Sequence, residues 1–583
     1  MQVKQEIIKA LSDAVKGLGL SEEDIKIQLE RPADENHGDY STNIALVISK
    51  ILKKNPFELA EKIASSVQRL ASSSIDKVEA VKPGFINFWI SREWLINNLQ
   101  LTLKKKDEYG KGDKLKDKKI MVEFTDPNPF KEFHIGHLYS NTVGETLSRI
   151  LESQGADLRR ANYQGDVGMH VAKALYGLFH LCHAELVSAS KILENKILKQ
   201  VQDDTLNKKV KFLGEAYSFG AKVYEEDEIA KKEIQELNKK IYNKEPEVTV
   251  LYEKGRQWSL EYFETIYKRL GTKFDFYYFE SEVGVNGLKL VQEYLKKEVF
   301  EESQGVVIFP GKKYSLHDRV FINSLGLPTY EAKELGLAFK KYEDFKFDQS
   351  IVITGNEIIG YFKVLLAALG KIDPNLASKI KHLPHGMVRL PTGKMSSRSG
   401  NILTGEWLLD EVKRMLKENY PEMFDEVLEK VTVGAIKYAL LKNGIGHDIA
   451  FNFEESISLS GNSGPYVQYV YVRTQSVLLK VTSDKRKAIS NIKTPNKIEP
   501  AELSLLRALN RFEEVVEEAG KNYAPNLLCN YLFDLAQKFN LFYEKYKIIG
   551  SESEDFRLAL TAAVGQVIKS GLRLLGISAP NKM

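Results

Sequence analysis

Two short sequences with reactive or charged side chains stand far apart in this chain. His134, Gly136 and His137 belong to the sequence HIGH, and Lys394 to Arg398 form the sequence KMSSR. Two imidazoles can donate hydrogen bonds to phosphate oxygens as charge develops, and the glycine lets a nucleotide lie against the backbone. Together the two sequences predict a two-sided grip on the triphosphate of ATP, in an enzyme that activates a carboxylic acid as its adenylate.

The elements around the first sequence are expected to hold it at the start of a helix. An apolar strand ends near Phe124, and Pro127 and Pro129 prevent its continuation. The apolar residues of the next segment recur at helical spacing: they are Leu138, Leu147, Ile150 and Leu151. The unpaired N–H groups and the positive dipole end of such a helix favour phosphate.

The second sequence is expected to form a mobile loop. Lys394, Ser396, Ser397 and Arg398 lie in PTGKMSSRSGN, where proline and glycine residues flank the charged side chains. These side chains can close onto the β- and γ-phosphates and move away after pyrophosphate leaves.

Composition limits the class of protein. The chain has 583 residues, 43% hydrophobic and 28% charged, which is ordinary for a globular protein of three or four domains. The formal net charge is +4, so a surface for nucleic acid must come from local clustering of cations. Cys182 and Cys529 are far apart, which gives no support for a disulfide framework or a zinc site. No stretch approaches a membrane span, and we expect a cytoplasmic, monomeric protein without a structural metal.

Three domains are expected along the chain. Residues 1–115 predict an α+β unit, with a helix over about 41–54, another near 56–70 and a strand over 84–90. Residues 118–425 alternate strands, including Gly305 to Pro310 and Gln349 to Gly355, with helices, as an α/β nucleotide-binding domain does. Residues 426–583 predict a bundle of helices.

One segment within the α/β domain looks inserted. His183 to Asp204 lies between two helical stretches and resembles a translated mobile palindromic repeat; the alternative is a helical surface insertion native to the domain. Neither interpretation gives the segment a chemical role.

The motifs resemble those of class I aminoacyl-tRNA synthetases, and their surroundings resemble the arginyl-tRNA synthetase family. The supporting sequences are VEFTDPNPFKEFHIGH, NYQGDVG, YKRLGTKFDFYYFES, LPTYEAKELG, HGMV and GNSGPYVQYVYVR, with HGDYSTN and PGFINF near the start. The resemblance spans nearly the whole chain. It implies an additional amino-terminal tRNA-contacting domain, a Rossmann-type class I catalytic domain with insertions, and an all-α anticodon-binding domain.

The resemblance also implies an activity and a set of site residues. The enzyme would activate L-arginine with ATP and Mg²⁺, release pyrophosphate, and transfer arginine to the terminal adenosine of tRNA(Arg). The ATP-contacting positions are His134, Gly136, His137, Met387, Lys394, Ser396 and Ser397; the arginine-binding positions are Glu123, Asn128, Tyr330 and Glu334. A guanidinium presents planar N–H donors, so its pocket needs carboxylates and aromatic walls.

Several positions depart from the family pattern. Ser397 replaces the second lysine of KMSKS, so the charge in the transition state must come from Lys394, Arg398 and Lys131, three residues before His134. In the arginine pocket, a usual aspartate is Glu334 and a common glutamine is Ile358; Val167 and His170 replace a tryptophan and a glutamine of GDWGxQ.

Two groups of residues are candidates for tRNA contact. Tyr466, Tyr469 and Arg473 share one helical face, where the aromatic rings can stack on anticodon bases. Phe85 and Asn87 share one face of a short strand, and the resemblance implies contact with the tRNA D-loop. The alternatives are that the tyrosines belong to the bundle core and that the strand face is packed.

Two other functions remain open from the sequence. One is another class I synthetase, of the cysteine or glutamate type, although the cysteine type lacks its zinc ligands here and neither explains the amino-terminal domain. The other is a non-catalytic tRNA-binding paralogue, which would have little reason to keep His134, His137 and Lys394.

Overall fold

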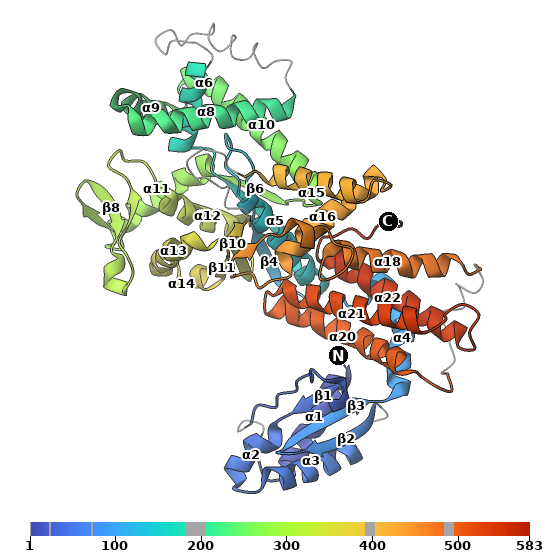
Figure 1. Cartoon of the computed structure of the whole chain (residues 1–583). Coiled ribbons are helices and arrows are strands. Elements are labelled where there is room, and N and C mark those ends of the chain that lie inside the picture. Colours follow the sequence, from blue (N-terminus) through green and yellow to red (C-terminus); the bar gives the residue numbers. More distant parts are fainter. Residues whose placement is uncertain (1, 22–24, 71–73, 182–204, 391–402, 483–494) are drawn as a thin grey trace.

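A computed structural model describes residues 2–21, 25–70, 74–181, 205–390, 403–482 and 495–583. The amino-terminal unit lies at the bottom of Figure 1, where ion pairs join it to the carboxyl-terminal helices: Arg31 with Glu514 and Glu35 with Lys538. Its antiparallel sheet has the order β1 (Tyr40–Thr42), β3 (Phe85–Ile90), β2 (Ile75–Val81). Helices α1 (Gln2–Lys16), α2 (Ile44–Leu52) and α3 (Pro56–Leu70) complete this α+β unit.

The helix expected over about 41–54 begins later than predicted. Tyr40, Ser41 and Thr42 instead pair with β3, and α2 starts only at Ile44. The hydroxyl of Thr42 accepts a hydrogen bond from the backbone N–H of Ile44 at 3.3 Å, which marks the turn from strand to helix. The β-forming side chains of β1 therefore prevail over the helical pattern that follows them.

A five-stranded parallel sheet forms the centre of the molecule. Its order is β11 (Ile380–His385), β10 (Gln349–Gly355), β4 (Lys119–Glu123), β5 (Asp157–Gln164), β6 (Phe276–Phe279). The chain builds outward from β4 to β6 and then returns to the other side of β4, which makes β4 and β10 the switch point of a doubly wound fold. Ligands bind at the carboxyl ends of the strands at such a point.

Helix α5 (Ile135–Ser153) follows β4 and is buried along almost its whole length. It packs against the sheet on one side and against helices of the carboxyl-terminal bundle on the other (Figure 1). Gly144 allows this close approach, because a Cβ there would lie 2.1 Å from the Phe124 ring. The loop between β4 and α5 carries the HIGH sequence to the switch point.

Two further groups of elements lie outside the parallel sheet. A helical group stands at the top of Figure 1: α6 (Met169–Leu181), α8 (Leu206–Glu226), α9 (Glu228–Tyr242) and α10 (Pro246–Leu270). A second group follows β6: α11 (Glu280–Leu295), β7 (Glu301–Ser303), β8 (Val306–Phe309), β9 (Arg319–Ile322), α12 (Tyr330–Asp344), α13 (Ile359–Ile372) and α14 (Pro374–Ser378). The proposed inserted element 183–204 lies outside the described residues.

The strand predicted at Gly305 to Pro310 exists but belongs elsewhere. It is β8, the middle strand of a small antiparallel sheet of order β7-β8-β9, and it has no place in the parallel sheet. An apolar run of this length predicts a strand without specifying its partners, which explains the difference.

The last part of the chain is helical, as predicted. Its helices are α15 (Gly405–Asn419), α16 (Asp425–Leu441), α17 (Phe453–Ile457), α18 (Gly464–Leu479), α20 (Pro500–Lys521), α21 (Pro525–Lys545) and α22 (Glu554–Leu574). Helix α4 (Arg92–Lys105) connects the amino-terminal unit to this bundle and packs against α20 and α22. None of the helices described is long and apolar enough to cross a membrane.

Candidate active site

His134 and His137 form the start of α5, as the sequence predicts, and each ring helps to cap the helix. His134 is the N-cap residue, and its Nδ1 accepts hydrogen bonds from the backbone N–H groups of Gly136 (3.1 Å) and His137 (3.3 Å). The Nδ1 of His137 accepts from the backbone N–H of His134 at 3.2 Å. The two rings stack with centroids 3.4 Å apart.

This arrangement changes which groups face a phosphate. The N–H groups of Ile135, Gly136 and His137 all have partners in this conformation, so they are not the free donors that the sequence predicts. Because each Nδ1 accepts a hydrogen bond, the proton of each neutral ring lies on Nε2. The imidazole Nε2–H groups are therefore the donors that the loop offers.

Both rings are neutral at physiological pH. Burial, with a smaller contribution from the positive charge of Lys131, lowers the pKa of His134 to about 4. Burial and then His134 itself lower the pKa of His137 well below its usual value. The pair therefore donates hydrogen bonds without carrying a positive charge, which has to come from other residues.

The KMSSR sequence lies outside the described residues, but the chain on both sides of it is described. The backbone N–H of Ile135 donates to the carbonyl oxygen of Leu403 at 3.1 Å, and His134 pairs with Thr404 as an isolated β-bridge. The undescribed stretch 391–402 thus ends directly beside the HIGH sequence. On its other side it follows β12 (Val388–Arg389), which pairs with β13 (Ile449–Ala450).

Lys131 lies in the same loop as the histidines. Its ammonium nitrogen is 4.6 Å from the centre of the Tyr217 ring, and its charge contributes to the lowered pKa of both His134 and His137. None of the ion pairs found among the described residues includes Lys131. Its charge is therefore free to act on a bound anion.

Met387 is 47% exposed and lies in the short connection between β11 and β12. Its backbone N–H donates to the Asp448 carboxylate at 2.9 Å, and its carbonyl oxygen accepts from the N–H of Ile449 at 2.7 Å. A carbonyl oxygen has a second lone pair, so of the two backbone groups only the carbonyl retains capacity for a purine.

Three carboxylates interact at the end of β4 and on α12: Glu123 is buried, and Asp126 and Glu334 are half-buried. Glu123, at the end of β4, forms a 2.5 Å ion pair with Lys341 of α12, and both side chains are almost completely buried. Burial and then repulsion from Glu123 raise the pKa of Asp126 and of Glu334 well above their usual values. Lys341 forms an ion pair with only one of these three acids, and its charge lowers the pKa of the other two by less than burial and Glu123 raise it.

Asn128 and Glu280 meet at Gly165. A Cβ on Gly165 would lie 2.3 Å from the Asn128 Oδ1 and 3.1 Å from a carboxylate oxygen of Glu280, so a larger residue there would displace the Asn128 side chain. Glu280 forms a buried 2.6 Å ion pair with Lys333. Tyr330, which begins α12, is 58% exposed, and the Lys333 ammonium lies 5.2 Å from its ring.

Three positions that depart from the family pattern have structural roles. Val167 is buried in the core of the helical insertion. His170 is buried and its Nε2 lies 2.7 Å from the Gly165 carbonyl, and burial first lowers its pKa to about 3. Ile358 packs at the edge of the core beside β10 and α13.

The predicted anticodon residues form a connected cluster on α18 and α21. Arg473 donates to the hydroxyl of Tyr469 at 2.9 Å and to the side-chain oxygen of Asn540 at 2.6 Å. The side-chain amide of Asn540 donates to the hydroxyl of Tyr466 at 2.8 Å. The Arg473 guanidinium lies 4.8 Å from the Tyr469 ring centre and 5.0 Å from that of Tyr543. Tyr466 is buried, whereas Tyr469 is only half-buried.

On the amino-terminal sheet, the two residues predicted to contact tRNA, Phe85 and Asn87, differ in burial. Phe85 is 40% exposed, but Asn87 is 5% exposed and its side-chain oxygen accepts a 2.7 Å hydrogen bond from Ser41. Phe85 is thus available for stacking. Asn87 serves the contact between β1 and β3.

Sequence reasoning missed Asp126, Lys341, Glu280 and Lys333. Asp126 lies in the loop directly after β4, and Lys341 follows Glu334 by two helical turns on the same face, so both had a positional signal. The ion pairs themselves join segments far apart in the chain, and no local pattern indicates them.

Comparison with known protein families gives three matches. The family described as "tRNA synthetases class I (R), catalytic domain" matches residues 98–453. "Arginyl tRNA synthetase N terminal domain" matches residues 1–90, and "DALR anticodon binding domain" matches residues 467–583.

Individual relatives agree with these matches. The chain is 32% identical to the arginine–tRNA ligase of Borrelia garinii, over 100% of this chain and 99% of the relative. It is 31% identical to that of Flavobacterium psychrophilum, over 96% of both chains. The structure of Thermus thermophilus arginyl-tRNA synthetase has the same fold, with a TM-score of 0.75, 23% identity and 99% coverage of both chains.

Proposed function

Because this chain belongs to the arginyl-tRNA synthetase family, it is an arginine–tRNA ligase, and we propose how its residues divide the reaction. Family membership over the full length sets aside the cysteine and glutamate types of class I synthetase. The roles below rest on the geometry of this chain.

The two histidines stabilise the α-phosphate during attack by the arginine carboxylate. In this step the carboxylate oxygen bonds to the α-phosphorus and pyrophosphate leaves with the electron pair of the broken P–O bond. The supporting observation is that both rings, locked by their Nδ1 contacts, present Nε2–H donors from one helix start. Such preorganised donors need no rearrangement as charge develops.

Positive charge for the leaving pyrophosphate comes from Lys131 on one side and from Lys394 with Arg398 on the other, and Ser396 and Ser397 add hydroxyl donors. The hydrogen bond between Ile135 and Leu403 supports this division, because it holds Leu403, the first described residue after the KMSSR sequence, beside the first loop. Gly136 leaves room for the nucleotide, and the Met387 carbonyl receives the adenine amino group.

The guanidinium of arginine enters the group formed by Glu123, Asp126 and Glu334. The pKa values of Asp126 and Glu334 are raised by burial and by Glu123, and a cation bound between them would favour their ionised forms. We assign Glu123 to holding Lys341 and orienting the pocket, and Asn128 to the α-amino or carboxylate end. Tyr330, exposed at the start of α12, covers the bound amino acid.

The tRNA meets the chain at two places. Tyr469, whose ring lies beside the guanidinium of Arg473, is the anticodon-stacking residue, and Tyr466 supports the cluster from the core. Phe85 stacks on a base of the D-loop, and Asn87 holds the strand that presents it.

Mg²⁺ enters with ATP as a phosphate-neutralising ion. Within the described part of the chain, no group of three or more His, Cys, Asp or Glu side chains is placed to hold a metal. The monomeric state and the cytoplasmic location expected from the sequence stay predictions.

One assay tests the ligase assignment. The purified protein is incubated with ATP, total tRNA and each labelled amino acid in turn, and acid-precipitable label is counted. Arginine alone is expected to become attached; attachment of a different amino acid would overturn the assignment.

A further inference from the structure

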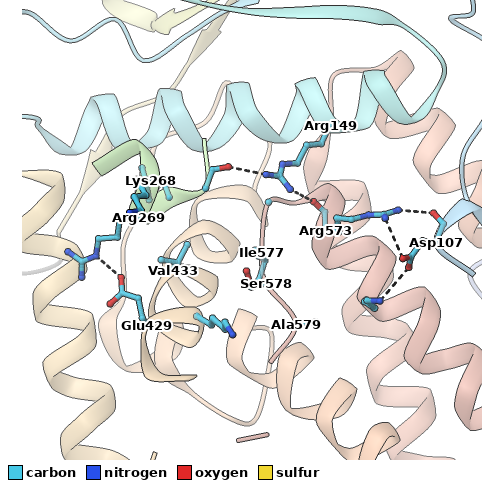
Figure 2. Close-up of a pocket in the computed structure, with 15 residues that line it drawn as sticks. Asp107, Arg149, Lys268, Arg269, Glu429, Val433, Arg573, Ile577, Ser578 and Ala579 are labelled. Atoms are coloured by element: carbon cyan, nitrogen blue, oxygen red, sulfur yellow. Dashed lines mark hydrogen bonds and ion pairs between the residues drawn. The ribbon is translucent and has the colours of Figure 1, made fainter. Parts of the chain in front are cut away.

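A basic cavity lies at the junction of the catalytic core and the helical bundle, away from the active site (Figure 2). Its volume of about 510 Å³ is within the range of ligand pockets. Six of its lining residues are cationic and two are acidic: Arg149, Lys268, Arg269, Lys430, Lys569 and Arg573 against Asp107 and Glu429.

The cavity is distinct from the ATP site. Arg149 follows His134 by fifteen residues on α5, which separates the two by about 22 Å along the helix axis. Gly271, also in the wall, belongs to the loop that leads into β6, at the amino edge of the sheet. The active site lies at the opposite, carboxyl edge.

The two acids in the wall do not neutralise the cations. Asp107 is shared by Lys569 at 3.5 Å and Arg573 at 3.9 Å. Glu429 is likewise shared, by Arg269 at 2.6 Å and by Lys413 at 2.8 Å. Two arginines of the wall also pair with acids outside it, Arg149 with Glu145 at 2.6 Å and Arg269 with Asp410 at 2.7 Å. The net positive charge of the cavity therefore comes from Lys268 and from Lys569 and Arg573, which share a single acid.

Arginine side chains connect the walls of the cavity, and lysine side chains offer N–H donors to a ligand. Arg149 donates to the carbonyl oxygens of Gly271 (3.0 Å) and Arg573 (3.2 Å), as Figure 2 shows. It thereby connects α5 to the loop after α10 and to the end of α22. Lys268 has no ion-pair partner in the described ranges and is exposed. Lys430 pairs only with Glu426, on the surface of α16.

A buried lysine adds to the positive field. The Lys437 ammonium, 1% exposed, donates to the carbonyl oxygens of Leu270 (2.7 Å) and Gly576 (2.9 Å), two residues of the cavity wall. Burial first, and then the charge of Arg149, lower the pKa of Lys437 to about 7. A bound anion would favour its charged form.

We propose that this cavity binds a phosphate group and thereby links the catalytic core to the helical bundle. Several ammonium donors around a fixed arginine frame suit the oxygens of a phosphate. The phosphate comes either from a free compound such as pyrophosphate or from the backbone of the tRNA, and the second source rests on the proposed function.

The test compares a double lysine variant of the full chain with a single lysine variant that serves as the control. Lys268→Gln/Lys430→Gln removes two cavity charges whose side chains lie at the surface, and Lys289→Gln removes an exposed charge on α11. Equilibrium dialysis with labelled pyrophosphate, with the active site filled by a non-hydrolysable ATP analogue, measures the free-anion arm. Filter binding of tRNA over a salt series measures the backbone arm.

If the cavity binds phosphate, the double variant should bind either pyrophosphate or tRNA about tenfold more weakly than the wild type, and Lys289→Gln should bind both as the wild type does. Weaker pyrophosphate binding identifies a free compound, and weaker tRNA binding with a shallower salt slope identifies the backbone. Lys268→Arg/Lys430→Arg should bind like the wild type, which separates charge from folding. Equal behaviour of the double variant and Lys289→Gln in both arms would overturn the proposal.

The proposed function is tested separately. Arginine-dependent ATP–pyrophosphate exchange should be unchanged in Lys268→Gln/Lys430→Gln, because neither side chain lies near the ATP site. A failure of the cavity proposal therefore leaves the roles of the active-site residues untouched.

Discussion

The backbone N–H of Ile135 donates a hydrogen bond to the carbonyl oxygen of Leu403, 3.1 Å away. The two residues are separated by half the chain, yet one follows the first histidine of the HIGH sequence and the other lies five residues after Arg398. The contact places Leu403, the first described residue after the KMSSR sequence, beside the helix start that carries both imidazoles. This contact supports the proposal that the two sequences bind one nucleotide.

Removing a histidine should slow activation far more than it alters folding. His137→Ala is expected to reduce arginine-dependent ATP–pyrophosphate exchange, measured with tRNA present, by about a hundredfold or more, on the scale of a lost oxyanion-type donor. His317→Ala, an exposed histidine near the small antiparallel sheet, serves as the control. A His137→Ala rate equal to that of the control would remove His137 from the mechanism.

Lys131 should act on turnover rather than on ATP affinity, because Ser397 leaves one charge to be replaced in the transition state. We expect Lys131→Ala to lower kcat by about a hundredfold while the KM for ATP changes little. Lys131→Arg, which keeps the charge, should recover part of the rate. Small and equal effects on kcat and KM would reject the compensation.

Glu334 should determine arginine binding. Glu334→Gln is expected to raise the KM for arginine about tenfold without altering that for ATP, since it removes a charged acceptor for the guanidinium. Glu343→Gln, on the exposed side of the same helix, is the matched control. If both variants bind arginine like the wild type, the carboxylate group around Glu334 is not the arginine pocket.

The buried state of His134 predicts a pH dependence of stability. Its pKa is about 4 in the folded protein and about 6.5 when unfolded, so the unfolded chain takes up the proton first as pH falls. Its contribution is fully present above pH 6.5 and declines towards pH 4. Urea unfolding of the wild type and of His134→Gln, compared from pH 7 to pH 4, should show their difference shift in favour of the variant. A difference that does not change with pH would contradict this.

The sequence predicts the elements that carry local signals. The strand before the HIGH sequence, the start of α5 at His134 and the helical bundle all follow from proline positions and apolar periodicity. Long-range partners do not follow in this way. The pairing of Glu123 with Lys341 joins residues 218 apart, and the placement of β8 in a separate sheet depends on which strands lie beside it.

The histidines show the same limit at closer range. Their position at a helix start was predictable. The hydrogen bonds that their Nδ1 atoms accept from backbone N–H groups were not, because these depend on the orientation of the rings. That detail moves the phosphate donors from the backbone to the Nε2–H groups. It changes the proposed mechanism without changing the proposed site.

The most direct measurement is a crystal structure of the chain with arginine and a non-hydrolysable ATP analogue. The account predicts one triphosphate with its oxygens within about 3.2 Å of the Nε2 atoms of His134 and His137 and of the Lys394 ammonium. A nucleotide that contacts the histidines while Lys394 lies remote from its phosphates, or a nucleotide bound elsewhere, would contradict it.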